Sequence, residues 1–209
     1  MKHLRIMCLL LVLSFTIGAL AQGQPTSPAK PATPAAQPQP QQPPPTMASV
    51  VDREISSYEK LLVDVAEAMP EDKYNFSPES LGIKGSSYAG VRTFAQLLKH
   101  TATANFRFWS GLSGDPLPDS VKNAKGSNGP DELKTKAEIV QFVKDSFAVG
   151  HRAAKSITAE NALEPVQFRN STAPRMFLAT FAVIHDADEY GQMVEYLRMN
   201  GVVPPASRQ

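Results

Sequence analysis

Residues 175–200 carry the feature that most constrains the fold, because their apolar side chains recur every three or four positions. This spacing is typical of an amphipathic helix, and Gly201 followed by Pro204 would end it. The expected inward face consists of Leu178, Phe181, Ala182, His185, Glu189, Gln192, Met193, Tyr196 and Met199. His185 and Glu189 lie one turn apart in the middle of that face. An imidazole and a carboxylate directed at a core need a partner, so they either hydrogen-bond each other or hold a metal ion.

Three more segments have the same helical period, namely 48–68, 90–112 and 135–157. Thr135 and Glu138 form a capping-box sequence at the start of the last of these. Together with 175–200, these segments predict an all-α domain, a four-helix bundle with long connections.

The connections 71–89, 113–134 and 158–174 are expected to be loops. The second is rich in Gly, Pro, Asp, Asn and Ser, and no strand-like alternation of apolar and polar residues is present in the chain. We therefore expect no β-structure.

Residues 1–21 have the pattern of a secretory signal peptide. Lys2 and Arg5 precede an apolar run at 6–17, and small residues at 19–21 suit a cleavage site. An uncleaved membrane anchor is the alternative, but the apolar run is shorter than the roughly 20 residues that span a bilayer. We expect an exported protein, periplasmic or secreted, with no membrane span in the mature form.

The only cysteine, Cys8, lies inside this expected signal peptide. Its removal would leave a mature protein without cysteine. Disulfides, thiolate nucleophiles and thiolate metal ligands are then excluded.

Residues 22–46 are expected to be a disordered linker. They hold nine of the 18 prolines and have no acidic or aromatic residue, so they cannot bury enough apolar surface to fold. The remainder, 47–209, has the length of one domain.

The charge of that domain argues against a nucleic-acid partner. Three of the 21 Lys and Arg residues and none of the 20 Asp and Glu residues precede position 47, so the domain is slightly acidic. It also has no cluster of basic residues interleaved with aromatic ones. The expected partner is a small molecule of unknown identity, and a homodimer remains compatible with the sequence.

Outside the signal peptide the histidines are His100, His151 and His185. Two histidines and one carboxylate that leave a position open are a common set for zinc and other divalent ions. Helix bundles build such sites from side chains on facing helices. His185 and Glu189 could therefore share an ion with His100, and His151 is a competitor for that third place. A histidine satisfied within the core is the alternative for each of them.

The motifs of the chain resemble the DinB-like superfamily, the damage-inducible and thiol-transferase helical bundles. The resemblance is carried by Val91–His100, by Met69–Pro78 before it, and most specifically by His185–Gln192 followed by Tyr196–Pro205. It covers essentially all of 47–207, and the motifs occur in the order that the family shows.

The resemblance implies a divalent metal, with zinc or nickel foremost, held by one histidine on the second helix and two residues at i and i+4 on the fourth. Matched by position, these are His100, His185 and Glu189. The family usually has histidine where this chain has Glu189, which affects the identity and affinity of the metal.

Two functions are compatible with these observations. The first is a metal-dependent hydrolase or transferase. Characterised members of the family use cytosolic thiols, so an export signal favours a different substrate. The second is a non-catalytic exported module that binds a small molecule or a protein.

Overall fold

The computed structural model of the protein describes residues 43–208. The expected signal peptide and nearly all of the expected linker lie outside the described residues. Five α-helices are described: α1 (Met47–Ala68), α2 (Phe94–Ser113), α3 (Asp119–Asn123), α4 (Lys136–Lys155) and α5 (Arg175–Met199). An antiparallel hairpin joins β1 (Pro165–Phe168) to β2 (Ser171–Pro174). Short 3-10 turns occur at Glu71–Lys73, Pro78–Leu81 and Pro205–Ser207.

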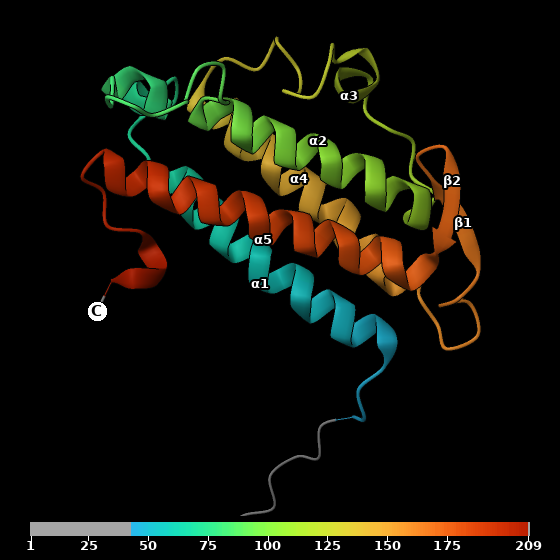
Figure 1. The fold of residues 1–209 in the computed structure, drawn as a ribbon. Coiled ribbons are helices and arrows are strands. Elements are labelled where there is room, and N and C mark those ends of the chain that lie inside the picture. The colour runs from blue at the N-terminus through green and yellow to red at the C-terminus, as the bar shows by residue number, and fades with distance from the viewer. Residues whose placement is uncertain (1–42, 209) are drawn as a thin grey trace, which may run out of the picture. The chain divides into compact units, whose positions relative to one another are not determined.

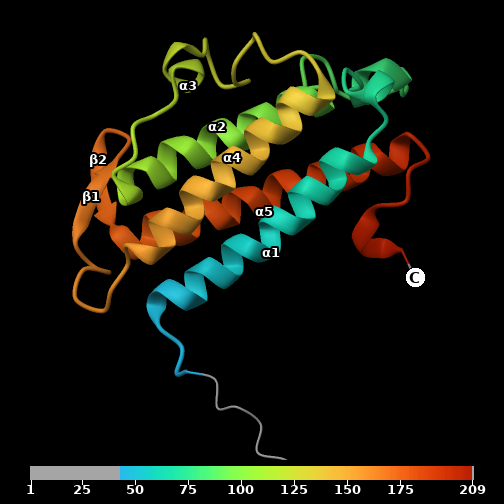
Figure 2. The ribbon, with the colours of Figure 1, turned by 180° about the vertical axis from the view of Figure 1, so that it is seen from behind.

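The four long helices lie side by side, as Figures 1 and 2 show from opposite sides. Helix α2 packs against α4 and α5, and α1 packs against the same two helices from the other side. The apolar side chains that these helices direct toward one another form one core. Its largest fully buried side chains are Trp109, Phe94, Phe147, Ile55, Leu62, Met69, Leu97, Leu98, Ile139, Leu178, Met193 and Leu197.

The mostly helical class is confirmed, but two details of the expectation are wrong. The segment 113–134 contains the short helix α3, so the described residues have five α-helices rather than four. The segment 158–174 contains the β-hairpin, whose strands of four residues each are too short to show a clear alternation. This hairpin is held by packing, because Phe168 contacts Phe108 of α2 and Phe181 of α5.

Capping residues explain where three of the long helices begin. Capping boxes start α1 at Thr46, α2 at Thr93 and α4 at Thr135. The last of these was predicted from the sequence. The Thr93 cap places the start of α2 later than the expected position 90. Helix α5 instead begins directly after β2, with Pro174 at its N-terminus, so the hairpin is attached rigidly to α5.

Helix α5 is exposed at two positions of the expected stripe and buries four residues outside it, Ala179, Val183, Asp186 and Leu197. Gln192 and Met199 are exposed, while Asp186 and Leu197 are fully buried. Helix α5 contacts both α1 and α2. Its buried face is therefore wider than the single stripe that the sequence predicted.

No α-helix of the described part of the chain combines the length and the apolar character that a bilayer crossing requires.

Helices α2 and α4 approach each other closely where Gly150 faces the ring of Trp109. A Cβ atom on Gly150 would lie 2.7 Å from Cε3 of Trp109, and the tryptophan side chain is fully buried. The two helices can therefore approach this closely only because residue 150 has no side chain.

We expect Gly150→Ala to destabilise the protein. Overpacking costs about 1–3 kcal/mol and the better helix propensity of alanine returns up to about 1 kcal/mol, so the net loss should be about 1–2 kcal/mol. Urea unfolding measures it. The control is Gly191→Ala, at an exposed helical glycine with nothing within 4 Å of the added Cβ, which should gain about 0.5–1 kcal/mol. Equal effects of the two substitutions would contradict the close contact.

His151 joins α4 to α1 through two carboxylates. Its Nδ1 lies 2.7 Å from Oδ1 of Asp52 and its Nε2 lies 3.0 Å from Oε2 of Glu59. Burial by itself would lower the pKa of His151, but the two carboxylates outweigh it and raise the pKa above the usual value. The protonated imidazole is therefore a bridge between the two helices.

Stability should depend on pH through this bridge. Because the folded-state pKa of His151 is raised, its contribution is fully present below the unfolded pKa of about 6.5 and is lost as the pH rises through the folded value. The free energy of unfolding of the wild type minus that of His151→Gln should be largest on the acid side of neutrality and should shrink at alkaline pH. Urea titrations of both proteins across this range measure the difference, and a difference that is constant with pH would refute the bridge.

Candidate metal centre

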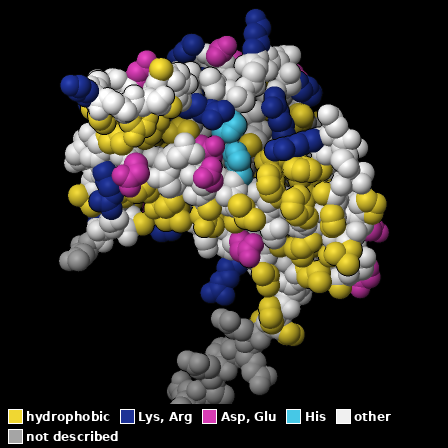
Figure 3. Space-filling model, in the orientation of Figure 1, with side chains coloured by type: hydrophobic (Ala, Val, Ile, Leu, Met, Phe, Trp, Pro, Cys, Tyr) yellow, Lys and Arg dark blue, Asp and Glu magenta, His cyan; other side chains and the backbone are white. Residues whose placement is uncertain are grey.

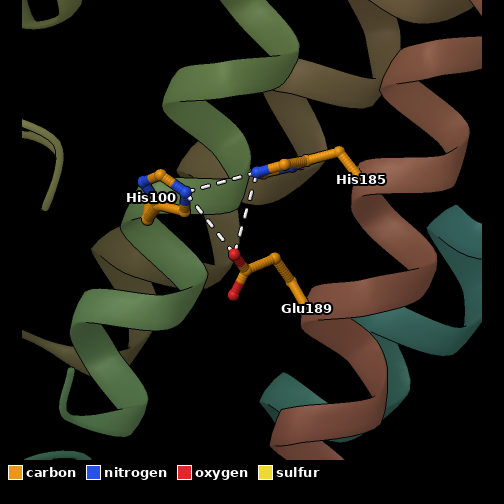
Figure 4. A group of neighbouring side chains, drawn as sticks. All are labelled: His100, His185 and Glu189. Carbon is orange, nitrogen blue, oxygen red and sulfur yellow. Dashed lines mark hydrogen bonds and ion pairs between the residues drawn. The ribbon is translucent and has the colours of Figure 1, made fainter. Parts of the chain in front are cut away.

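The three predicted site residues converge between α2 and α5. His100 comes from α2, and His185 and Glu189 come from successive turns of α5 (Figure 4). The two Nε2 atoms of the histidines lie 3.2 Å apart. Oε1 of Glu189 lies 3.5 Å from Nε2 of His100 and 3.7 Å from Nε2 of His185. Among the described residues, this is the group of histidine and acidic side chains that could hold a metal ion.

The spacing of these donor atoms fits a metal ion of zinc's size. Bonds of about 2.0–2.1 Å to a tetrahedral ion place neighbouring donors about 3.3–3.4 Å apart, whereas octahedral bonds of the same length place adjacent donors about 2.9–3.0 Å apart. The three distances of 3.2, 3.5 and 3.7 Å are therefore closer to the tetrahedral value. A proton shared between the two imidazoles would explain the contact of their nitrogens without a metal ion, but it would not involve Glu189. Glu189, within reach of both nitrogens, makes the group a three-donor set.

Burial dominates the electrostatics of the site. Burial raises the pKa of Glu189 to about 7, with the charge of Arg92 opposing the rise and that of Asp188 adding to it. Burial, together with the neighbouring His100, lowers the pKa of His185 to about 4. Both shifts favour the neutral form of the group. Neutral imidazoles are the form that binds a metal ion, and an ion would compensate the buried carboxylate.

A loop outside the helices orients His100. The Nδ1–H of His100 donates to the main-chain carbonyl of Ser127, so its Nε2 keeps a lone pair directed at the site. Burial lowers the pKa of His100, although this hydrogen bond has the opposite effect. A main-chain carbonyl behind a histidine is a common support for a metal ligand.

That loop is held against α2 by three side-chain bonds. Nζ of Lys99 donates to the carbonyl of Pro130 at 2.8 Å, and Nε of Arg92 donates to Asn128 at 3.0 Å. Arg92 also donates to the hydroxyl of Ser127 at 3.1 Å. Gly129 has a positive φ of 77°, and a Cβ there would lie 2.7 Å from the main-chain oxygen of Lys99. The absence of a side chain at Gly129 therefore lets the loop approach α2 closely.

His151 does not belong to the site. It faces Asp52 and Glu59 of α1, so the competition between His151 and His100 is resolved in favour of His100 by the geometry.

Asp186, the neighbour of His185 in the chain, was not among the residues expected on the inward face of α5. It is fully buried, and no hydrogen bond joins it to a histidine within the described chain. Burial raises its pKa well above the usual value, and the neighbouring Asn105 amide only partly opposes the rise. A protonated Asp186 in the core is the expected state.

A cavity of about 460 Å³ opens beside the two histidines. Its wall consists of His100, Thr103, Ala104, Arg107, Phe108, Ser127, Gln167, Phe168, Arg169, Leu178 and His185. The small side chain of Ala104, one turn after His100, leaves the room that the sequence predicted beside that imidazole. The cavity is large enough for a small-molecule ligand.

Sequence reasoning missed three contributors to this region. Arg107 lies two turns after His100 on α2, a spacing from which it could have been found. The carbonyl of Ser127 and the side chain of Arg169 come from a loop and from the hairpin turn, and no local pattern of the sequence points to either.

The fold and the site together define a helical protein with a candidate three-donor metal site between two of its helices. The chain belongs to the DinB superfamily, whose family model matches residues 54–193. Among curated proteins, none matches the chain.

Two solved structures share the fold. A DinB-like protein from Bacillus subtilis is 15% identical, with a TM-score of 0.54 over 77% of this chain and 99% of that one. A DinB-like protein from Bacillus cereus is 16% identical, with a TM-score of 0.51 over 73% of this chain and 89% of that one. At these identities the likeness concerns the fold alone.

The geometry predicts which substitutions abolish metal binding. His185→Ala should weaken zinc binding by more than about a hundredfold. Loss of a residue that only supports a ligand costs up to about that factor, and His185 is a ligand itself. Glu189→His should keep or tighten binding, since it supplies the nitrogen donor usual in the family. Metal content and competition titration of the untagged proteins measure both effects.

The control for these variants is His151→Ala, which removes a histidine outside the site. It should bind zinc like the wild type. Stoichiometric zinc retained in His185→Ala, or lost in His151→Ala, would show that the ion lies elsewhere.

Proposed function

We propose that this protein is an exported metal-dependent hydrolase or transferase that acts on a small molecule. The ion is divalent, zinc rather than nickel, and is held by His100, His185 and Glu189. The observation that carries the proposal is the triangle of donor atoms, with edges of 3.2, 3.5 and 3.7 Å, whose two histidines line a cavity. Export is supported by the signal-like pattern of 1–21 and the proline-rich segment after it.

The residues around the cavity have distinct tasks in this proposal. A divalent ion held by three protein ligands supplies Lewis acidity toward a substrate oxygen or carbonyl. The carbonyl of Ser127 holds His100 in the tautomer that presents Nε2. Glu189, only 4% exposed, contributes the one negative charge of the donor set. Phe108, whose ring meets that of His185 edge-on at 6.1 Å, limits the access of water to the donors.

A second function, the non-catalytic binding module, is favoured by one observation. Apart from the two histidines, the described residues of the cavity wall include no Asp, Glu, Tyr or Lys that could act as a separate acid or base. The cavity would then serve to hold a ligand, and the metal would serve to bind it.

Turnover by the purified mature protein distinguishes the two functions. We expect hydrolysis of activated esters or amides, or addition of a thiol to an electrophile, to require zinc and to be lost after chelation. His185→Ala should lose this activity, whereas His151→Ala should keep it. Ligand binding without any metal-dependent turnover would assign the binding module instead. A protein that binds no divalent ion would contradict both forms of the proposal.

A further inference from the structure

The wall of the cavity beside His100 carries an excess of positive charge. Arg107 projects from α2 and Arg169 from the turn of the β-hairpin, and both line the cavity. No acidic residue is among the described residues of its wall. Figure 3 shows histidine side chains at the surface beside Lys and Arg side chains, an acidic side chain and a broad hydrophobic area.

Neither arginine is neutralised within the described part of the chain. The ion pairs of the structure involve other basic residues, such as Arg152 with Asp115, and no carboxylate lies within ion-pair distance of Arg107 or Arg169. Guanidinium groups that face a cavity without a carboxylate partner are typical binding groups for carboxylate and phosphate oxygens.

The backbone at Arg169 indicates that its side chain has a role beyond the turn. Arg169 has a φ of 54°, and it is the only described residue other than glycine with a positive φ. It is the first of the two residues between Phe168 and Ser171, which pair across the hairpin. Glycine is the usual residue where such a turn needs a positive φ. An arginine there is disfavoured by the backbone, which makes its side chain a candidate for a role in the site.

Part of the cavity wall is aromatic, with Phe108 and Phe168 beside the two arginines. Phe108 and Phe168 have ring centroids 6.1 Å apart, and Phe181 contacts both of them. The guanidinium group of Arg169 lies over the Phe168 ring at 5.1 Å, which holds the charge at the edge of the aromatic surface. An apolar group and an anionic group of one ligand could therefore be bound side by side.

We infer that the cavity binds an organic oxyanion, a carboxylate or phosphate carried on an apolar body, with Arg107 and Arg169 as its anion-binding residues. This inference rests on the proposed function, because it names the substrate class of the same site. Thr103 adds a further polar group, since its buried hydroxyl lines the cavity and has no partner among the described residues.

The test uses three small probes on metal-free protein, so that no ion contributes to anion binding. Phenylacetate, phenyl phosphate and the neutral phenylacetamide share an aromatic ring and differ in charge. Calorimetry should show that at least one anion binds about tenfold or more tightly than the amide, the effect expected of a charge-assisted hydrogen bond. Whichever of phenylacetate and phenyl phosphate binds more tightly shows whether the site prefers a carboxylate or a phosphate.

Two variants and a control assign the preference to the arginines. Arg107→Gln and Arg169→Gly should each reduce the preference for the anion, whereas Arg53→Gln, at an exposed arginine of α1 outside the cavity, should leave it unchanged. Arg169→Gly should have the thermal stability of the wild type or higher, because glycine suits the turn. Its loss of anion binding therefore cannot be attributed to misfolding.

The inference fails if the amide binds as tightly as the anions, if no probe binds, or if the arginine variants keep the preference. Zinc titration of the same proteins separates this failure from that of the proposed function. Neither arginine is a metal ligand, so both variants should bind zinc like the wild type. A wild type that prefers the anion but binds no zinc would refute the proposed function and leave the anion site standing.

Discussion

The approach of α2 to α5 at His100 and His185 is the contact on which the site depends. Two imidazole nitrogens 85 positions apart in the chain lie 3.2 Å from each other, beside a carboxylate that is 4% exposed. Burying these groups is unfavourable, because each loses the water that would solvate its charged form. The apolar packing of the four long helices must offset this cost, and the contact of Trp109 with Gly150 shows how closely that packing is fitted.

Two segments outside the long helices, a loop and the β-hairpin, complete the site. The loop around Ser127 is held against α2 by Lys99 and Arg92 and supplies the carbonyl that orients His100. The hairpin continues directly into α5 and packs through Phe168 on the rings beside His185. Each segment is therefore attached to or held beside a helix that carries a donor, so the donors and the cavity wall are positioned by the same elements.

Charge is distributed in two zones around the cavity. Inside, the donor set has two imidazoles held neutral and a carboxylate whose pKa is raised to about 7, an arrangement that favours a bound cation. Outside, Arg107 and Arg169 face the cavity without acidic neighbours in its described wall, an arrangement that favours an anion. A metal ion and an anionic small molecule are complementary to these zones. The proposed metal ion and the proposed anionic ligand are thus both explained by the same charge distribution.

The four long helices and the pairing of His185 with Glu189 could be predicted because their signals are local. Apolar side chains at helical spacing, the capping box at Thr135, and the i, i+4 relation of His185 and Glu189 are properties of short segments, and the structure agrees with each of them. The hairpin could not be predicted, since its strands of four residues are held by contacts of Phe168 with two distant helices. The full burial of Asp186 was missed for a related reason, because α5 is covered by two helices and not by one.

The sequence by itself determined the four long helical segments and which histidine shares a helix face with Glu189. Only the tertiary structure decided that His100 and not His151 joins them, since both histidines lie at the edge of an apolar stripe. The decision depends on which neighbour each helix face meets: α2 turns His100 toward α5, while α4 turns His151 toward the carboxylates of α1. The helical period specifies the direction in which a side chain projects from the helix axis. The partner that it meets in that direction is set by packing between segments far apart in the chain.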